Sequence, residues 1–167
     1  GDMLQAVRHI CGVQSPTRGI LPGGFSNQPA SGNTNIIQYI TTSTTGNAVD
    51  FGDVTISESV RGHAAASNAV RGVYGGGIKY PGSVQAGLEF ITMSSLGNGT
   101  TFGDLTYSAR QEGGGCASPT RGVFGGAYSP SALNTINYIQ IMTTGDAVDF
   151  GDLTIARGTG ALSNGHG

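Results

Sequence analysis

The sequence predicts an all-β fold made of tandem four-stranded repeats, and two observations support this prediction. The string Phe-Gly-Asp recurs at positions 51–53, 102–104 and 150–152, while Gly1-Asp2 matches the end of a fourth occurrence. The aspartates lie at positions 2, 53, 104 and 152, so they are 51, 51 and 48 residues apart. A near-constant period of this length indicates one supersecondary unit repeated in tandem. The composition agrees, because 30 glycines in 167 residues and only 11% charged residues favour turns over helices.

Four short strands are expected within each unit, and the third repeat presents them in order. A run of small residues at 116–118 comes first, and an alternating segment at 120–124 follows and ends at a glycine pair. Strong alternation over 135–142 predicts the third strand, and 147–155, which contains the Phe-Gly-Asp string, predicts the fourth. The segment 143–146 between them carries Gly and Asp, which accept the positive φ of a hairpin turn.

The repeats define the expected domain organisation, which is a single repeat domain over residues 1–167. The expected units are a partial repeat at 1–14, repeats at about 15–66, 67–117 and 118–157, and a partial repeat at 158–167. Four strands in a unit of this length are typical of a β-propeller blade, and a propeller needs about four blades to close. We therefore expect an incomplete ring within this chain. The alternative is a β-trefoil, which also has three four-stranded repeats but has no use for partial repeats at its ends.

The order of residues within a unit resembles that of kelch repeats, which form propeller blades. In the third repeat the shared features are Gly125-Gly126, then Tyr138, then the aromatic Phe150 and finally Arg157. Kelch repeats usually carry tryptophan where all three repeats of this chain carry phenylalanine. The resemblance implies kelch-like blades in each repeat.

A longer phrase is similar to repetitive proteins of marine bacteriophages, especially those of cyanobacteria, that are assigned to the virion. It reads Gly-Gly, then Asn-Thr-Ile-x-Tyr-Ile, then Thr-Thr-Gly-x-Ala-x-Asp-Phe-Gly-Asp-Leu-Thr-x-Ala-Arg, and it covers residues 125–157. This resemblance implies a structural protein of the extracellular virion, in a tail fibre, baseplate or capsid appendage, with a role in host attachment. The incomplete ring predicts further repeats of the same polypeptide or symmetry-related copies as partners, and the resemblance adds other virion proteins and host-surface glycans. The alternative is a kelch-like or lectin-like binding module unrelated to a virion.

Most charged residues recur at fixed positions of the repeat. Seven of the eight Lys and Arg residues occupy two repeated positions. An active site needs a unique constellation, whereas residues repeated in every unit more often brace each unit. We therefore expect no enzymatic activity, no catalytic residue, no cofactor and no metal site. The repeated positions expected to brace the fold are Asp53, Asp104, Asp152, Arg18, Arg71 and Arg121.

The remaining residues with reactive or metal-binding side chains also favour a structural role over a catalytic or metal-binding one. A cation site at Asp50 and Asp53 is the weaker alternative, because Thr101 interrupts that pattern in the second repeat. The three histidines lack metal-ligand spacing, and Cys11 and Cys116 are expected to be reduced, buried thiols. A net charge of −2 and the lack of a long apolar run give no reason to expect nucleic acid or membrane insertion.

Sequence and length vary between repeats in the segment after each glycine pair, at 25–33, 78–85 and 127–133. Variable loops often carry recognition, and amide and aromatic side chains could hydrogen-bond to and stack on a sugar. The alternative is that these are ordinary solvated loops. The candidate ligand-binding residues are Asn27, Gln28, Lys79, Tyr80, Gln85 and Tyr128.

Overall fold

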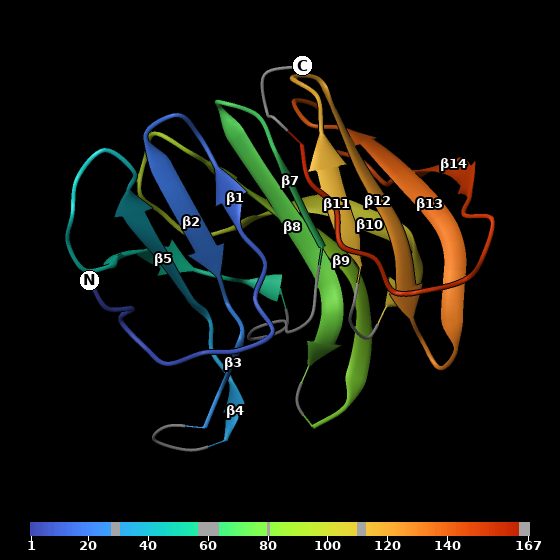
Figure 1. Cartoon of the computed structure of the whole chain (residues 1–167), viewed down its shortest axis with the longest axis horizontal. Coiled ribbons are helices and arrows are strands. Elements are labelled where there is room, and N and C mark those ends of the chain that lie inside the picture. The colour runs from blue at the N-terminus through green and yellow to red at the C-terminus, as the bar shows by residue number, and fades with distance from the viewer. Residues whose placement is uncertain (28–30, 57–63, 80, 110–112, 164–167) are drawn as a thin grey trace.

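The computed structural model describes residues 1–27, 31–56, 64–79, 81–109 and 113–163. Every element named in these ranges is a β-strand, so the predicted all-β class is confirmed (Figure 1). The strands form several four-stranded antiparallel sheets, which confirms four strands per unit. A search of this part of the chain for a helix able to span a membrane found none.

Three four-stranded sheets follow one another along the chain, and we call them sheets 1, 2 and 3. Sheet 1 contains β1 (Val13–Gln14), β2 (Arg18–Pro22), β5 (Ile36–Thr41) and β6 (Val49–Asp53). Sheet 2 contains β7 (Ala64–Ser67), β8 (Arg71–Lys79), β9 (Ser83–Thr92) and β10 (Thr100–Ala109). Sheet 3 contains β11 (Gly114–Ala117), β12 (Arg121–Tyr128), β13 (Ala132–Gln140) and β14 (Val148–Asp152). A two-stranded hairpin of β3 (Phe25–Ser26) and β4 (Gly32–Asn33) is inserted between β2 and β5.

Each sheet is an antiparallel meander in which strands adjacent in sequence are paired. Its first strand comes from the end of one predicted repeat, and its other three strands come from the next. No backbone ladder joins strands of different sheets in the described ranges. The sheets therefore meet through side chains and isolated hydrogen bonds.

The sequence pattern predicted that the second strand of each unit ends at the glycine pair. In sheet 1 it does, because β2 ends at Pro22, directly before Gly23-Gly24, but in the other two sheets the strand runs past the pair. In sheets 2 and 3 it continues to Lys79 and Tyr128, past a register shift at Gly76 and at Gly126. These glycines have φ values of 70° and 64°, which L-residues with side chains rarely adopt. A glycine with positive φ at this point makes a β-bulge and lets the strand resume, so part of the expected loop is strand.

The sheets lie side by side in chain order, and their first strands contact one another (Figure 1). β7 lies against both β1 and β11. The approach to β11 is close: a Cβ on Gly115 would lie 2.2 Å from the carbonyl oxygen of Ala65. Only glycine permits this separation between two backbones.

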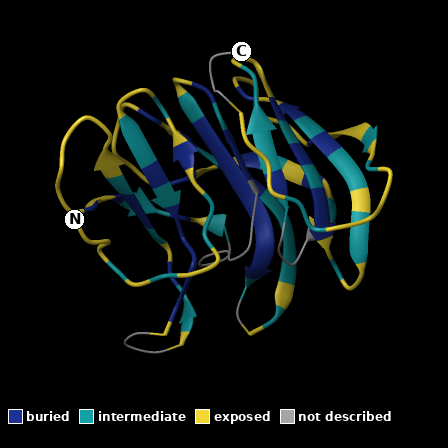
Figure 2. Ribbon diagram, in the orientation of Figure 1, coloured by how far each residue is buried: buried dark blue, intermediate teal, exposed yellow. Residues whose placement is uncertain are grey.

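The hydrophobic core is divided into two layers, one between each pair of neighbouring sheets. The layer between sheets 1 and 2 contains Val13, Ile20, Ile37, Phe51, Val54, Ala65, Tyr74, Ile91 and Met93. The layer between sheets 2 and 3 contains Ala66, Val73, Leu88, Phe102, Leu105, Phe124, Ile139, Ile141 and Ala147. Buried residues accordingly concentrate along β8 in the middle sheet, which has a neighbour on both sides (Figure 2).

Candidate functional site

The most regular polar feature of the molecule joins the last strand of one sheet to a turn of the next. We call this contact a junction. Between sheets 1 and 2, the carbonyl of Phe51 accepts the N–H of Gly97 at 2.8 Å, and the carbonyl of Asp53 accepts the N–H of Gly99 at 2.8 Å. The N–H of Asp53 donates to Oδ1 of Asn98 at 2.9 Å. The Phe-Gly-Asp string is thus an inter-sheet connector.

The junction between sheets 2 and 3 repeats these three bonds. The carbonyl of Phe102 accepts the N–H of Gly145, and the carbonyl of Asp104 accepts the N–H of Ala147, both at 2.8 Å. The N–H of Asp104 donates to Oδ1 of Asp146 at 3.0 Å. Asp53 and Asp104 therefore reach the neighbouring sheet through their backbone.

The N-terminal residues make the same contacts on sheet 1. The N–H of Asp2 donates to Oδ1 of Asn47 at 2.9 Å, and its carbonyl accepts the N–H of Ala48 at 2.8 Å. Gly1-Asp2 therefore lies on sheet 1 where a Gly-Asp pair of a preceding sheet lies in the other junctions.

A buried polar side chain on the third strand completes each junction. It accepts the N–H of the second residue after the aspartate. The three pairs are Gln38 with Leu4 at 2.9 Å, Glu89 with Thr55 at 2.9 Å and Asn137 with Thr106 at 2.8 Å. All three acceptors are at most 1% exposed. Sequence analysis did not single out these residues, although a polar residue at one fixed position of an otherwise apolar strand was a visible signal.

Glu89 has the largest set of donors among these acceptors. Besides Thr55, its carboxylate accepts the N–H of Ile56 at 2.5 Å and the hydroxyl of Tyr74 at 3.1 Å. Burial raises the pKa of Tyr74 well above its ordinary value, and the Glu89 carboxylate raises it further. Tyr74 therefore stays neutral and donates a hydrogen bond to the carboxylate.

The repeated arginines stack on the aromatic residue of the third strand. The pairs are Arg18 over Tyr39 at 4.9 Å, Arg71 over Phe90 at 4.0 Å and Arg121 over Tyr138 at 4.6 Å, measured from the guanidinium carbon to the ring centroid. Two of these guanidinium groups also reach the next sheet. Arg18 donates to the carbonyl of Met93 at 2.8 Å. Arg71 donates to the carbonyl of Ile141 at 3.2 Å.

The described candidate ligand-binding residues lie in or next to the hairpins β3–β4, β8–β9 and β12–β13, which project at one edge of the molecule (Figure 1). Asn27 is exposed after β3 and lines a hollow with Ala6, Val7, Arg8 and Phe25, none of which was a candidate. Lys79 ends β8, and Tyr128 ends β12 with 41% of its surface exposed. Gln85 lies within β9, and its Nε2 donates to the Ser83 hydroxyl at 3.0 Å. Gln28 and Tyr80 lie outside the described residues.

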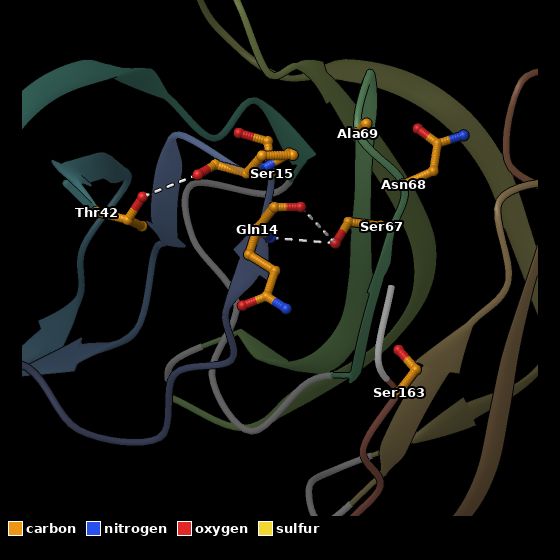
Figure 3. A pocket seen from close by; sticks show the side chains of 8 residues that line it. Gln14, Ser15, Thr42, Ser67, Asn68, Ala69 and Ser163 are labelled. Atoms are coloured by element: carbon orange, nitrogen blue, oxygen red, sulfur yellow. Dashed lines mark hydrogen bonds between the residues drawn. The ribbon is translucent and has the colours of Figure 1, made fainter. Parts of the chain in front are cut away.

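A polar hollow of about 190 Å³ opens between the turns of sheets 1 and 2 (Figure 3). No charged residue lines it, and it is smaller than the roughly 300 Å³ that small-molecule sites usually need. At its wall the Ser67 hydroxyl both accepts the N–H of Gln14 and donates to its carbonyl, each at 3.1 Å. These bonds brace β1 against β7. The lining residues are Gln14, Ser15, Pro16, Thr42, Ser67, Asn68, Ala69 and Ser163.

Residues with metal-binding or nucleophilic side chains form no cluster in the described part of the chain: no three His, Cys, Asp or Glu residues gather there. Asp50 and Asp149 instead accept the N–H groups of Gly52 and Gly151 within their own strings, at 3.1 and 3.0 Å. Cys11 is a free cysteine, and burial raises the pKa of its thiol, which keeps it protonated.

No protein-family model matches this chain, and no curated protein matches it significantly.

Proposed function

We propose that this chain is a non-enzymatic structural component of a bacteriophage virion, located in a tail fibre, baseplate or capsid appendage. In this role it contributes kelch-like β-propeller blades that form a rigid platform in the extracellular particle. Further repeats and other virion proteins are its partners, and its hairpin edge faces the host surface.

The observation that carries the structural role is the use of the repeated polar residues. The Phe-Gly-Asp strings at 51–53 and 102–104 join neighbouring sheets, and the guanidinium groups of Arg18 and Arg71 do the same. A catalytic site would instead need a unique set of titratable groups around a cavity. Residues that hold neighbouring sheets together at both described junctions favour stiffness as the property that the repeats provide.

The propeller arrangement is supported by the way the sheets meet. Each is a four-stranded meander, and the first strands β1, β7 and β11 lie against one another. Blades of a propeller are such meanders, arranged around a common axis. A closed barrel, as in a trefoil, would need backbone ladders between repeats.

The virion assignment rests on the similarity of residues 125–157 to repetitive phage proteins. Its test is mass spectrometry of purified phage particles from a lysate in which the gene is expressed. We expect to find peptides of this chain in the particles at a fixed copy number relative to the capsid protein. This ratio should stay the same after density-gradient purification and salt washes. Peptides found only in the unassembled fraction would contradict the virion role.

A binding module unrelated to a virion is the second candidate, and the exposure of Tyr128 at the hairpin edge favours it. A glycan array probed with the intact chain tests this function. Binding that Tyr128→Ala removes, together with absence from particles, would support the module over the virion component.

A further inference from the structure

The turn of sheet 2 differs from the equivalent turns of sheets 1 and 3 at one position of the junction. The residue that donates its N–H to the aspartate carbonyl is Gly99 in sheet 2, whereas it is Ala48 in sheet 1 and Ala147 in sheet 3. All three residues are buried. Only the turn of sheet 2 therefore has a glycine at this position, and it directly follows Asn98.

The buried pair of Tyr74 and Glu89 accounts for this glycine. A Cβ on Gly99 would lie 2.3 Å from Oε2 of Glu89 and 2.5 Å from the hydroxyl oxygen of Tyr74, which is closer than such atoms can approach. Tyr74 lies opposite Glu89 in the strand register, whereas the residues opposite the other two buried acceptors, Leu21 and Phe124, carry no hydroxyl. The polar pair of sheet 2 therefore occupies the space in which the other two turns hold an alanine methyl group.

An asparagine that precedes a glycine can lose its side-chain amide without an enzyme. The glycine nitrogen gives up its proton and attacks Cγ of the asparagine, and no Cβ on the glycine hinders this approach. A bond forms between this nitrogen and Cγ, the bond from Cγ to Nδ2 breaks, and Nδ2 leaves with the proton as ammonia. Water then opens the resulting five-membered imide at either of its carbonyl groups. The residue becomes aspartate or isoaspartate.

The closed junction holds both groups that this reaction needs. The N–H of Gly99 donates to the carbonyl of Asp53 at 2.8 Å, and Oδ1 of Asn98 accepts the N–H of Asp53 at 2.9 Å. The nitrogen of Gly99 therefore keeps its proton, and the Asn98 amide is fixed in place. Asn98 is exposed, so water can reach it. A local opening of the contact with Asp53 is the step that releases both groups.

We propose that Asn98 is a site of spontaneous deamidation in the folded protein, and that the junction between sheets 1 and 2 sets the rate. Water is the only co-reactant. The inference stands on the contacts of Asn98 and Gly99 and does not rest on the virion role.

The two products affect the junction differently. Sheet 3 already uses an aspartate at the equivalent position, where Oδ1 of Asp146 accepts the N–H of Asp104 at 3.0 Å. Conversion of Asn98 to aspartate therefore preserves its bond to Asp53. Isoaspartate adds a methylene group to the main chain before Gly99, which moves the Gly99 N–H away from the Asp53 carbonyl. The aspartate form keeps the junction closed, and the isoaspartate form loosens it.

Peptide mass spectrometry of incubated protein tests the site. The folded chain and the urea-unfolded chain are kept at the same mildly alkaline pH and then digested with trypsin. The digestion separates Asn98 from the other Asn-Gly pair of the sequence, at 164–165, which lies outside the described residues. We expect Asn98 to convert about 10- to 100-fold more slowly in the folded chain than in urea, as a local opening predicts.

The internal control is Asn47, which occupies the same junction position but precedes Ala48, and it should keep its amide over this time. Conversion of Asn98 in the folded chain as fast as in urea would overturn the proposal, because the junction would then give no protection. A lack of conversion in the folded chain would overturn it too.

Two matched variants show whether this particular junction controls the rate. Phe51→Leu loosens the apolar layer between sheets 1 and 2, whereas Phe102→Leu loosens the layer between sheets 2 and 3, and both phenylalanines are 3% exposed. We expect Asn98 to deamidate at least about threefold faster in Phe51→Leu than in Phe102→Leu. The comparison of the folded and unfolded parent chain remains decisive if a variant does not fold. Equal rates in two folded variants would refute control by the junction between sheets 1 and 2.

Discussion

At the scale of single residues, each junction depends on one buried acceptor whose chemical type differs between sheets. Gln38, Glu89 and Asn137 all accept a backbone N–H from the neighbouring connector. An amide and a carboxylate serve equally as acceptors in this geometry. This position therefore requires an acceptor oxygen within hydrogen-bond distance of the backbone N–H of the connector. The junction does not require the negative charge that Glu89 carries.

This reasoning predicts opposite outcomes for two substitutions of Glu89. Glu89→Leu leaves the N–H groups of Thr55 and Ile56 buried without an acceptor and should cost about 2–5 kcal/mol of unfolding free energy. Glu89→Gln keeps an acceptor oxygen, as Gln38 does in sheet 1, and should change stability by less than about 1.5 kcal/mol. Urea unfolding followed by circular dichroism gives both values. Equal losses for the two variants would show that the carboxylate charge itself is required.

Tyr74 allows a prediction about alkaline pH. Burial and the Glu89 carboxylate raise the pKa of Tyr74 above its ordinary value of 10.0. The stability that depends on the neutral phenol is fully present below the pKa of the unfolded chain and is lost as the pH rises above it. We therefore expect the unfolding free energy to fall between about pH 9 and about pH 11, and to fall less steeply in Tyr74→Phe. Identical slopes in the two proteins would contradict this assignment.

At the scale of elements, the period and the alternation of residues were sufficient to predict four strands per unit and their order. Two features of the strands could not be predicted from the sequence. The bulges at Gly76 and Gly126 depend on a positive φ, which a glycine pair permits but does not dictate. The junction bonds use backbone groups of Asp53 and Asp104. The repetition of aspartate in the sequence therefore indicated the right positions, but not that the backbone rather than the carboxylate makes the contact.

The equivalent phenylalanines of the second and third strings provide a prediction with an internal control. Phe102→Ala should cost about 3–5 kcal/mol, because Phe102 is buried between two sheets. Phe150→Ala should cost only about 1 kcal/mol, the value of its edge-on contact with Tyr138. Thermal and urea unfolding of dilute protein compare the two. A similar loss from both would mean that Phe150 is covered in solution even in dilute protein.

At the scale of the whole molecule, the described junctions and apolar layers join sheet 1 to sheet 2 and sheet 2 to sheet 3. Stability in such an array is close to a sum of unit and interface contributions. Sheet 2 has two closed junctions, whereas sheets 1 and 3 each have one to another sheet. Within the described residues, opening sheet 1 or sheet 3 therefore disrupts one apolar layer, whereas opening sheet 2 disrupts two.

Amide hydrogen exchange should reveal this gradient. Opening sheet 2 breaks two apolar layers, while opening sheet 3 breaks one, so amides of β8 and β9 should exchange more slowly than those of β12 and β13. Uniform protection of the three sheets in dilute protein would show that the fold opens as one cooperative unit, and that the junctions are stronger than the sheets they join.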